Sequence, residues 1–367
     1  MANNNGILMP PHTRAFSLEQ ALPRNLLRDC GKDRLQANPV EFSNWLFSHE
    51  ASGIPSVYRY LSYLKTMHEL AHAIAEIYDW RSPPDSYGRK EHLRHIGPVE
   101  MLFLANHLYV LDSFDVAGDV LECGASHGYS TCVLSHACVR LKRKLFVADS
   151  FEGLPPTRNN QVFFAQGDYA ASVESVSDNL AALGRLDAAV FIKGFFSNSL
   201  KEFRHPLCLL WLDVDLYESA QDVLTHVFNC LNPAGMIATH EFTDFYNRPH
   251  SIDEPCPPSA IFKAFEHAGL KYRAIHLMRY FGMIAGYNAI QPDSGMYFPY
   301  LLNKLEAMDH RSRQFLELKQ AHTVRTAFRI KNLLLPHKAK PSTPAGGSVA
   351  DALSAANLDI QKENVRS

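Results

Sequence analysis

The fold is decided by the stretch "DVLECGASHGYSTCVLSHACVRL", which spans residues 119–141. Its first part, 119–124, has the apolar character of a strand and ends at Gly124, whereas residues 129–141 have the pattern of a helix. A glycine-containing turn joins the two. A strand that leads through a short turn into a helix is the repeating unit of an α/β sheet.

The alternation of strands and helices continues from about residue 96 to residue 289. The apolar pattern predicts further strands at 144–149, 188–194, 207–215, 235–241, 271–277 and 281–287, with helices at 173–183, 219–231 and 259–268. Segment 207–215 is almost continuously apolar, as expected of a strand that is buried on both faces. Because the connections are short, we predict a doubly wound, Rossmann-like α/β sheet of seven strands that ends in a hairpin with one antiparallel strand.

The chain divides into four regions by composition. Residues 1–95 are predicted to form an N-terminal helical region, 96–289 the sheet domain, and 290–335 a C-terminal helical extension. From residue 336 to 367 the chain is rich in Pro, Ser, Ala and Gly and poor in bulky apolar residues, so this tail is predicted to be disordered.

Composition restricts the classes of function. The chain has 367 residues, 46% hydrophobic and 20% charged, which is typical of a globular protein with a sizeable core. A net charge of −2 argues against nucleic acid as a partner. No apolar run approaches the ~20 residues that a transmembrane helix needs. The seven cysteines form no CxxC pair and the start shows no secretory pattern, so we expect reduced thiols and a cytoplasmic location.

The motif "HELAH", residues 68–72, has the form of a zinc-peptidase signature, in which His68 and His72 would bind zinc and Glu69 would act as the base. The surrounding helix argues against that role. Its residues at spacings of three and four form one apolar stripe, which comprises Tyr60, Leu64, Met67, Ala71, Ile74 and Tyr78. The third histidine that would complete the motif after His72 is missing. We therefore interpret "HELAH" as the polar side of an amphipathic helix and disfavour a peptidase.

Polar residues converge at the carboxyl ends of the predicted strands, where open α/β sheets bind ligands. Glu122 ends the first strand, and Gly124 and Gly128 permit a tight turn beside a cofactor. The dinucleotide pattern G-x-G-x-x-G is absent, which disfavours NAD and suits a nucleoside without pyrophosphate. Asp149 ends the second strand, where a carboxylate can accept both ribose hydroxyls or, alternatively, cap a turn.

A second group of ionisable residues follows two later strands. Asp213 and Asp215 come at the end of an otherwise apolar strand, where buried acids are costly unless they bind a cation or donor groups. His240 and Glu241 end the next strand. Together these residues could place carboxylates and an imidazole around one ion.

Four motifs resemble those of the macrocin O-methyltransferase family, which belongs to the class I S-adenosylmethionine-dependent methyltransferases. They are "GDVLECGASHGYS", "LFVADSFEGLP", "FIKGFFSNSL" and "LWLDVDLYESAQDVL", and the resemblance covers about residues 99–245. It implies S-adenosylmethionine and magnesium as cofactors and a sugar hydroxyl on a natural product as acceptor. It also implies a methionine-end site at Glu122, Gly124, Ser126 and Gly128, a ribose contact at Asp149, an adenine site near Phe151 and Gly194, and a metal ligand at Asp215.

The chain departs from this family at two places. His240-Glu241 replaces a usual Asp-Asp pair, and the segment 158–172 lacks the family's catalytic histidine. Because imidazole suits transition metals, the divalent metal at Asp215, His240 and Glu241 could be magnesium or a transition metal. His240 could bind that metal, serve as the general base, or only bond to backbone.

We expect a metal-assisted, S-adenosylmethionine-dependent O-methyltransferase that acts on a small hydroxylated acceptor. Asp215 and His240 are its candidate catalytic residues. The N-terminal helices and residues 251–260 are expected to form a lid over the acceptor. A methyltransferase-like protein that binds cofactor without turnover is the alternative. The basic helix predicted at 311–335 favours packing against its own domain or a second subunit over a membrane surface, which leaves a homo-oligomer open.

Overall fold

In the computed structural model, the described residues are 22–35, 37–82, 94, 96–156, 164–242, 256–278, 280–287, 289 and 297–316. The chain divides into two compact units, Met1–Arg313 and Gln314–Ser367. The described part of the second unit is residues 314–316, the end of helix α14 (Phe298–Leu316). Most of the basic segment 311–335 and the whole tail 336–367 therefore lie outside the described residues.

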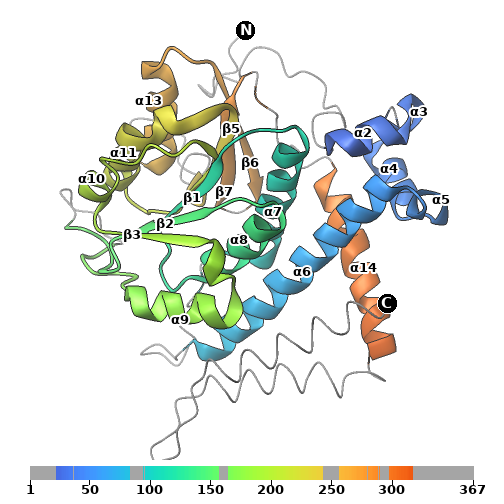
Figure 1. Cartoon of the computed structure of the whole chain (residues 1–367), viewed down its shortest axis with the longest axis horizontal. Helices are drawn as coiled ribbons and strands as arrows, with labels where there is room; N and C mark the ends of the chain where they lie inside the picture. The colour runs from blue at the N-terminus through green and yellow to red at the C-terminus, as the bar shows by residue number, and fades with distance from the viewer. Residues whose placement is uncertain are drawn as a thin grey trace, which may run out of the picture. The chain divides into compact units, whose positions relative to one another are not determined.

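A seven-stranded sheet forms the centre of the first unit, and its order is β3-β2-β1-β4-β5-β7-β6 (Figure 1). Strand β7 runs antiparallel to both of its neighbours, whereas β1 to β5 are parallel. The predicted doubly wound sheet with a terminal hairpin is thereby confirmed. The strands are β1 Asp119–Cys123, β2 Leu145–Asp149, β3 Ala189–Lys193, β4 Leu207–Leu212, β5 Leu231–Thr239, β6 Tyr272–Met278 and β7 Phe281–Gly286.

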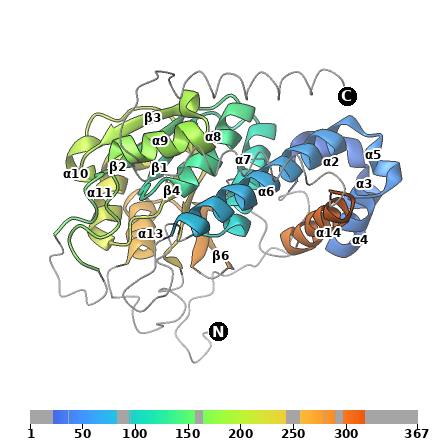
Figure 2. The ribbon, with the colours of Figure 1, turned by 90° about the horizontal axis from the view of Figure 1, so that it is seen from below.

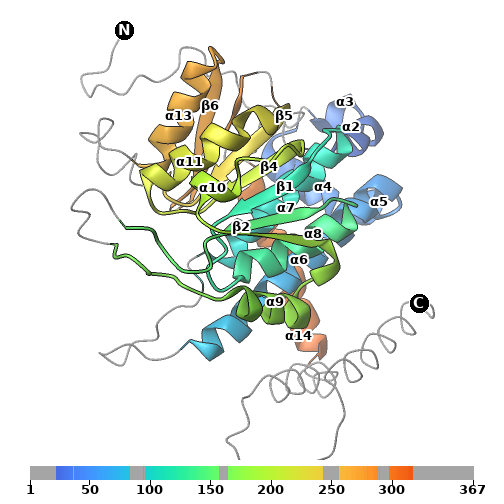
Figure 3. The same ribbon diagram turned by 60° about the vertical axis from the view of Figure 1, so that its left-hand side comes forward.

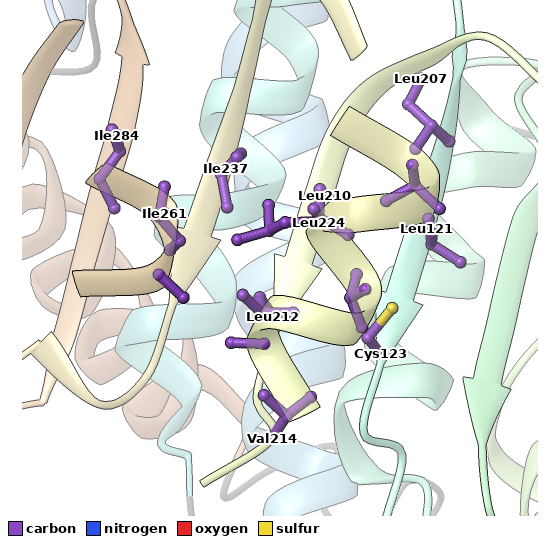
Figure 4. Close-up of a cluster of buried hydrophobic side chains, with 14 of the residues drawn as sticks. Leu121, Cys123, Leu207, Leu210, Leu212, Val214, Leu224, Ile237, Ile261 and Ile284 are labelled. Atoms are coloured by element: carbon purple, nitrogen blue, oxygen red, sulfur yellow. The ribbon is translucent and has the colours of Figure 1, made fainter. Parts of the chain in front are cut away.

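Helices α10 (Phe196–Ser199), α11 (Tyr217–Val227) and α13 (Pro257–His267) cover one face of the sheet (Figure 3). Alternate strand residues such as Leu121, Leu210 and Ile237 point to this face and pack against Leu224 and Ile261 (Figure 4). All five side chains are buried. The alternation of inward residues along each strand thus builds a continuous apolar layer under these helices.

Helices α7 (Pro98–Ser113) and α8 (Tyr129–Arg140) cover the other face, and α9 (Val173–Leu183) packs beside α8. Phe103 on α7 contacts the ring of Phe281 on β7 at 5.9 Å between centroids, and Phe281 in turn contacts Trp211 on β4 at 5.8 Å. These aromatic contacts fix α7 to the sheet.

The N-terminal helices are α2 (Arg24–Cys30), α3 (Lys32–Leu35), α4 (Pro39–Leu46), α5 (His49–Ser52) and α6 (Pro55–Arg81). Helix α6 lies along α7 and α8 (Figures 1 and 2). All six residues of the predicted apolar stripe are buried, at 0–3% exposure, which confirms the amphipathic interpretation of this helix. The Tyr60 hydroxyl donates to Asn106 Oδ1 at 2.7 Å, and the Tyr129 hydroxyl donates to the Ala71 carbonyl at 3.1 Å.

The largest differences from the predicted boundaries lie at β4, at the helix that follows it, and at β5, which is predicted at 235–241 and spans Leu231–Thr239. Strand β4 ends at Leu212 and not at residue 215, because Asp215 adopts a left-handed backbone with φ of 57°. The helix predicted at 219–231 starts at Tyr217 and ends at Val227, where a short 3-10 turn (Phe228–Cys230) leads directly into β5 at Leu231. The described helices include none that is long and apolar enough to cross a membrane.

Candidate active site

The turn between β1 and α8 has a left-handed backbone at three residues. The φ angles are 89° at Gly124, 45° at Ser126 and 86° at Gly128. A Cβ atom added to Gly124 would lie 1.8 Å from the carbonyl oxygen of Asp213, so only glycine permits the close approach of this turn to the end of β4. The amide of Asp213 also donates to the Cys123 carbonyl at 3.0 Å. The glycine turn and the acidic end of β4 are therefore in direct backbone contact.

Glu122 lies beneath this turn and is fully buried. Its Oε1 atom accepts a hydrogen bond from the Ser130 hydroxyl at 2.5 Å, whereas Oε2 has no hydrogen-bond partner among the described residues. Burial raises the pKa of Glu122 to about 8, although the Ser130 and Thr131 hydroxyls act in the opposite direction. The Ser126 hydroxyl is also buried without a partner in the described part of the chain. Two unsatisfied polar atoms at one turn are consistent with a site for a polar ligand.

Asp149, at the end of β2, supports the same turn. Its Oδ2 atom accepts from the amides of Ala125 and Ser126 at 2.7 and 3.3 Å, and Oδ1 accepts from the Phe151 amide at 2.7 Å. A weaker bond at 3.4 Å comes from the Ser150 hydroxyl to Oδ1. Burial raises the pKa of Asp149 despite these bonds. These four bonds use the roughly four acceptor positions of a carboxylate, so a ribose hydroxyl would take the place of the weak Ser150 bond at Oδ1.

Phe151 and Gly194 lie beside Asp149. Phe151 is 5% exposed, has a φ of 57°, and contacts Phe191 of β3 at 6.0 Å between ring centroids. The Gly194 amide, directly after β3, donates to the Asp149 carbonyl at 2.9 Å. The structure thus brings together the predicted cofactor residues of β1, β2 and β3 at one edge of the sheet.

A cluster of possible metal ligands follows β4 and β5. Ligand atoms of Asp213, His240 and Glu241 lie within 4.8 Å of one another, and this is the one group of its kind among the described residues. Nδ1 of His240 lies 3.7 Å from Oδ1 of Asp213. Glu241 accepts a bond from the Thr239 hydroxyl at 3.0 Å, and burial together with Asp213 and Asp215 raises its pKa well above the usual value. The compact set contains Asp213, which the sequence grouped with these residues but did not name among the proposed metal ligands, and not the predicted ligand Asp215.

Asp215 lies next to this cluster. Burial, followed by the charges of Asp213 and Asp168, raises the pKa of Asp215 to about 8. Tyr169, whose φ is 63°, has a pKa raised to about 12 by burial and by the same acids together with Glu241. The sequence did not point to Asp168 and Tyr169, because the segment between β2 and α9 that holds them has no strand or helix periodicity.

The donor set fits a divalent cation. Two carboxylates and one imidazole, with buried like charges that repel each other, are a favourable environment for a doubly charged ion. The mixture of oxygen and nitrogen donors suits zinc, iron or nickel better than magnesium.

His68 and His72 of "HELAH" do not belong to a three-ligand group in the described structure. Their rings lie 4.4 Å apart on α6. His68 is 4% exposed, so the interpretation of the motif as a polar helix side is wrong for this residue, whereas Glu69 is exposed and pairs with Lys65 at 3.8 Å.

Comparison with known proteins identifies the central segment. Residues 93–254 match the model of the macrocin O-methyltransferase family (TylF). Over this segment the chain is similar to that family. The match begins at the approach to α7 and includes β1 to β5, with every residue of the proposed cofactor and metal sites.

Two O-methyltransferases of known name are also similar to part of the chain. The first is the 8-demethyl-8-(2,3-dimethoxy-alpha-L-rhamnosyl)-tetracenomycin-C 4'-O-methyltransferase of Streptomyces olivaceus, 32% identical over 141 residues, or 35% of this chain and 54% of the relative. The second is the mycinamicin III 3''-O-methyltransferase of Micromonospora griseorubida, 29% identical over 143 residues, or 35% of this chain and 56% of the relative. The chain thus matches about half the length of these relatives.

Among solved structures, the O-methyltransferase NovP is similar at 21% identity and a TM-score of 0.49, over 60% of this chain and 97% of that chain. The assignment of the fold rests on the strand order and on the single antiparallel strand of the sheet itself.

Proposed function

We propose that the chain is an S-adenosylmethionine-dependent O-methyltransferase whose acceptor is a hydroxyl of a sugar or another small natural product. One observation carries the proposal. The glycine turn after β1 touches the acidic cluster after β4, with room for no side chain at Gly124. A cofactor held by this turn would therefore present its methyl group beside the cluster that could activate a hydroxyl. Methyl transfer needs mainly this alignment of donor and acceptor.

Several residues would hold the cofactor. The turn from Gly124 to Gly128 would enclose its methionine end, and Ser126 supplies a buried hydroxyl there that lacks a partner among the described residues. Glu122 would act from beneath the turn through Ser130, since it is fully buried. Asp149 would keep the turn in place and offer one acceptor position to the ribose. Phe151 and Gly194 would border the adenine.

The acidic cluster would handle the acceptor's proton. Asp213, His240 and Glu241 are the proposed ligands of a divalent cation because their ligand atoms lie within 4.8 Å of one another. A bound cation would lower the pKa of the acceptor hydroxyl. With His240 close to Asp213, a ligand role for His240 is favoured, and Asp215 beside the cluster becomes the proposed proton acceptor. Asp215 remains an alternative ligand.

The names of the relatives support the acceptor class. They describe methylation of a rhamnosyl 4'-hydroxyl on tetracenomycin and of the 3''-position of mycinamicin III. A sugar or glycosylated natural product is therefore the acceptor class to test first. We retain the N-terminal helices of region 1–95 and the segment 251–260 as the proposed acceptor lid. The seven free cysteines support a reducing, cytoplasmic location as part of the proposal.

Calorimetric titration tests the proposal. The wild-type chain would be titrated with S-adenosylmethionine and S-adenosylhomocysteine, with and without Mg²⁺, Mn²⁺ or Zn²⁺, and methyl transfer would then be measured on a panel of glycosylated acceptors. Asp213→Asn should retain S-adenosylhomocysteine binding within about threefold and lose at least about a hundredfold in turnover. Asp178→Asn, at an exposed position on α9, is the matched control and should lose neither.

The outcomes of this experiment separate the candidate functions. Absence of binding to both cofactor forms would refute the proposal. Tight binding with no transfer to any acceptor would favour a cofactor-binding protein without turnover. The replacement of the usual Asp-Asp pair by His240-Glu241 is the observation that supports this alternative.

A further inference from the structure

The turn that we assign to the cofactor is contacted by a helix that lies outside residues 93–254, the segment that matches the family model. The matched segment begins at residue 93, whereas α6 ends at Arg81. Nevertheless, the Tyr78 hydroxyl at the end of α6 donates to the carbonyl of His127, inside the turn, at 2.8 Å. Tyr78 is 1% exposed, so this hydrogen bond is shielded from water.

A second donor meets the same carbonyl. Asn179 Nδ2, on α9, donates to the His127 oxygen at 3.0 Å. The amide of Asn179 is oriented by α6, because Arg81 Nη1 donates to Asn179 Oδ1 at 2.9 Å. Both lone pairs of the His127 carbonyl are thus occupied, and both donors depend on the last turn of α6, one directly and one through Asn179.

The neighbouring residue is confined by the same two helices. A Cβ atom at Gly128 would lie 2.9 Å from Val176 Cγ1 on α9 and 3.7 Å from the Tyr78 hydroxyl. Gly128 is also the N-cap of α8, with a left-handed φ of 86°. Helices α6 and α9 therefore enclose the point where the turn becomes α8 (Figures 1 and 2).

A further link fixes the start of α8. Arg94 pairs with Asp79 of α6 at 2.5 Å and lies 5.7 Å over the ring of Tyr129, the first residue of α8. The last turn of α6 is consequently connected to both residues of the Gly128–Tyr129 step.

We infer that Tyr78, together with Arg81 acting through Asn179, is a positioning residue for the cofactor: it holds the His127 carbonyl so that the turn from Gly124 to Gly128 keeps its ligand-binding shape. The inference rests on the proposed function and extends the cofactor site to a helix outside the family segment. None of these three side chains needs to touch the cofactor. They act on the backbone that does.

The chain supplies a matched control. Tyr63, also on α6, donates its hydroxyl to a backbone carbonyl, that of Ala105 on α7, at 2.9 Å. It is 7% exposed. Tyr63→Phe and Tyr78→Phe therefore remove the same kind of buried bond from the same helix, and only the second bond ends in the cofactor turn.

Two measurements on the full chain test the inference. Affinity for S-adenosylhomocysteine is measured by calorimetry, and hydrogen–deuterium exchange is measured for the peptide 122–130. Tyr78→Phe should weaken binding about two- to tenfold, as expected for one hydrogen bond, and should speed exchange in the turn, where the Gly128 amide donates to the Ala125 carbonyl at 2.7 Å. Asn179→Ala should act in the same direction, and Arg81→Met more weakly. Tyr63→Phe should lose thermal stability to a similar degree and change neither readout.

The results distinguish a failure of the inference about Tyr78 from a failure of the proposed function. If the wild type binds and Tyr78→Phe matches Tyr63→Phe in affinity, the inference is overturned while the proposed function stands. Faster exchange in Tyr78→Phe with unchanged affinity would overturn it as well. A wild type that binds no cofactor form would refute the proposed function and the inference together.

Discussion

Replacing Gly124 by alanine tests the contact on which the proposed function depends. The backbone at Gly124 is left-handed, with φ of 89°, which costs an alanine about 1–2 kcal/mol. The new Cβ would also lie 1.8 Å from the Asp213 carbonyl oxygen, whereas real Cβ contacts essentially never fall under 3.0 Å. The glycine turn and the end of β4 must therefore move apart until this distance is at least 3.0 Å. Overpacking of this kind costs a further ~1–3 kcal/mol.

The expected total for Gly124→Ala is about 2–5 kcal/mol in the free energy of unfolding. Gly269→Ala is the control, because Gly269 also has a positive φ, 65°, but no atom of the described non-neighbouring residues lies within 4 Å of the position that its Cβ would take. It should therefore lose only about 1–2 kcal/mol. Chemical denaturation measures both. In the folded fraction, affinity for S-adenosylhomocysteine should fall at least about tenfold for Gly124→Ala and stay unchanged for the control. Equal losses in the two variants would refute the close approach of turn and acidic cluster.

Three further predictions follow from the site. Glu122→Gln should reduce the pH dependence of the free energy of unfolding. Because the pKa of Glu122 is about 8 in the folded chain and 4.5 ordinarily, the wild type loses stability as pH rises from 4.5 to 8, by up to ~1.4 kcal/mol per pH unit. Denaturation at pH ~5 and pH ~8 should therefore show that the wild type loses more stability than the variant. Asp149→Ala should weaken S-adenosylmethionine binding by ~1–3 kcal/mol, through a loosened turn and a lost ribose bond; unchanged affinity in a folded variant would remove Asp149 from the site. His240→Asp should shift the metal preference of the purified chain toward Mg²⁺, seen in calorimetric titrations, and an unaltered preference would exclude His240 as a ligand.

The sheet could be predicted because its strands are buried and its connections are short. Each apolar run becomes a strand within one or two residues at most ends, as at Val173–Leu183 for a helix and Leu145–Asp149 for a strand. The end of β4 was different. Val214 and Leu216 are 3% and 2% exposed, so the apolar alternation continues past the strand although the chain has already turned at Asp215.

That turn also explains why the ligand set could be predicted only in part. In sequence, Asp213 and Asp215 are equivalent members of "LDVDL", two residues apart on what the pattern indicates is one strand face. The left-handed backbone of Asp215 separates them, so that Asp213 joins His240 and Glu241 while Asp215 lies beside the group. Asp149 shows the same limit. The sequence predicts that Asp149 lies at a strand end. It does not predict the hydrogen bonds that the Ala125 and Phe151 amides donate to the carboxylate, because these depend on the folded turn.

The buried acidic residues at this edge of the sheet are energetically unfavourable without a ligand. Glu122, Asp215 and Glu241 all have raised pKa values, for which burial is the largest cause. Each carboxyl therefore opposes folding at neutral pH, since its charged form loses solvation. Glu122 is partly compensated by Ser130, but Asp215 and Glu241 are also repelled by Asp213. A cation at Asp213 would relieve the repulsion of Asp215 and Glu241 and, to a smaller degree, the repulsion that Asp213 exerts on Glu122. Metal binding should therefore stabilise the chain more strongly as pH rises, even when no cofactor is bound.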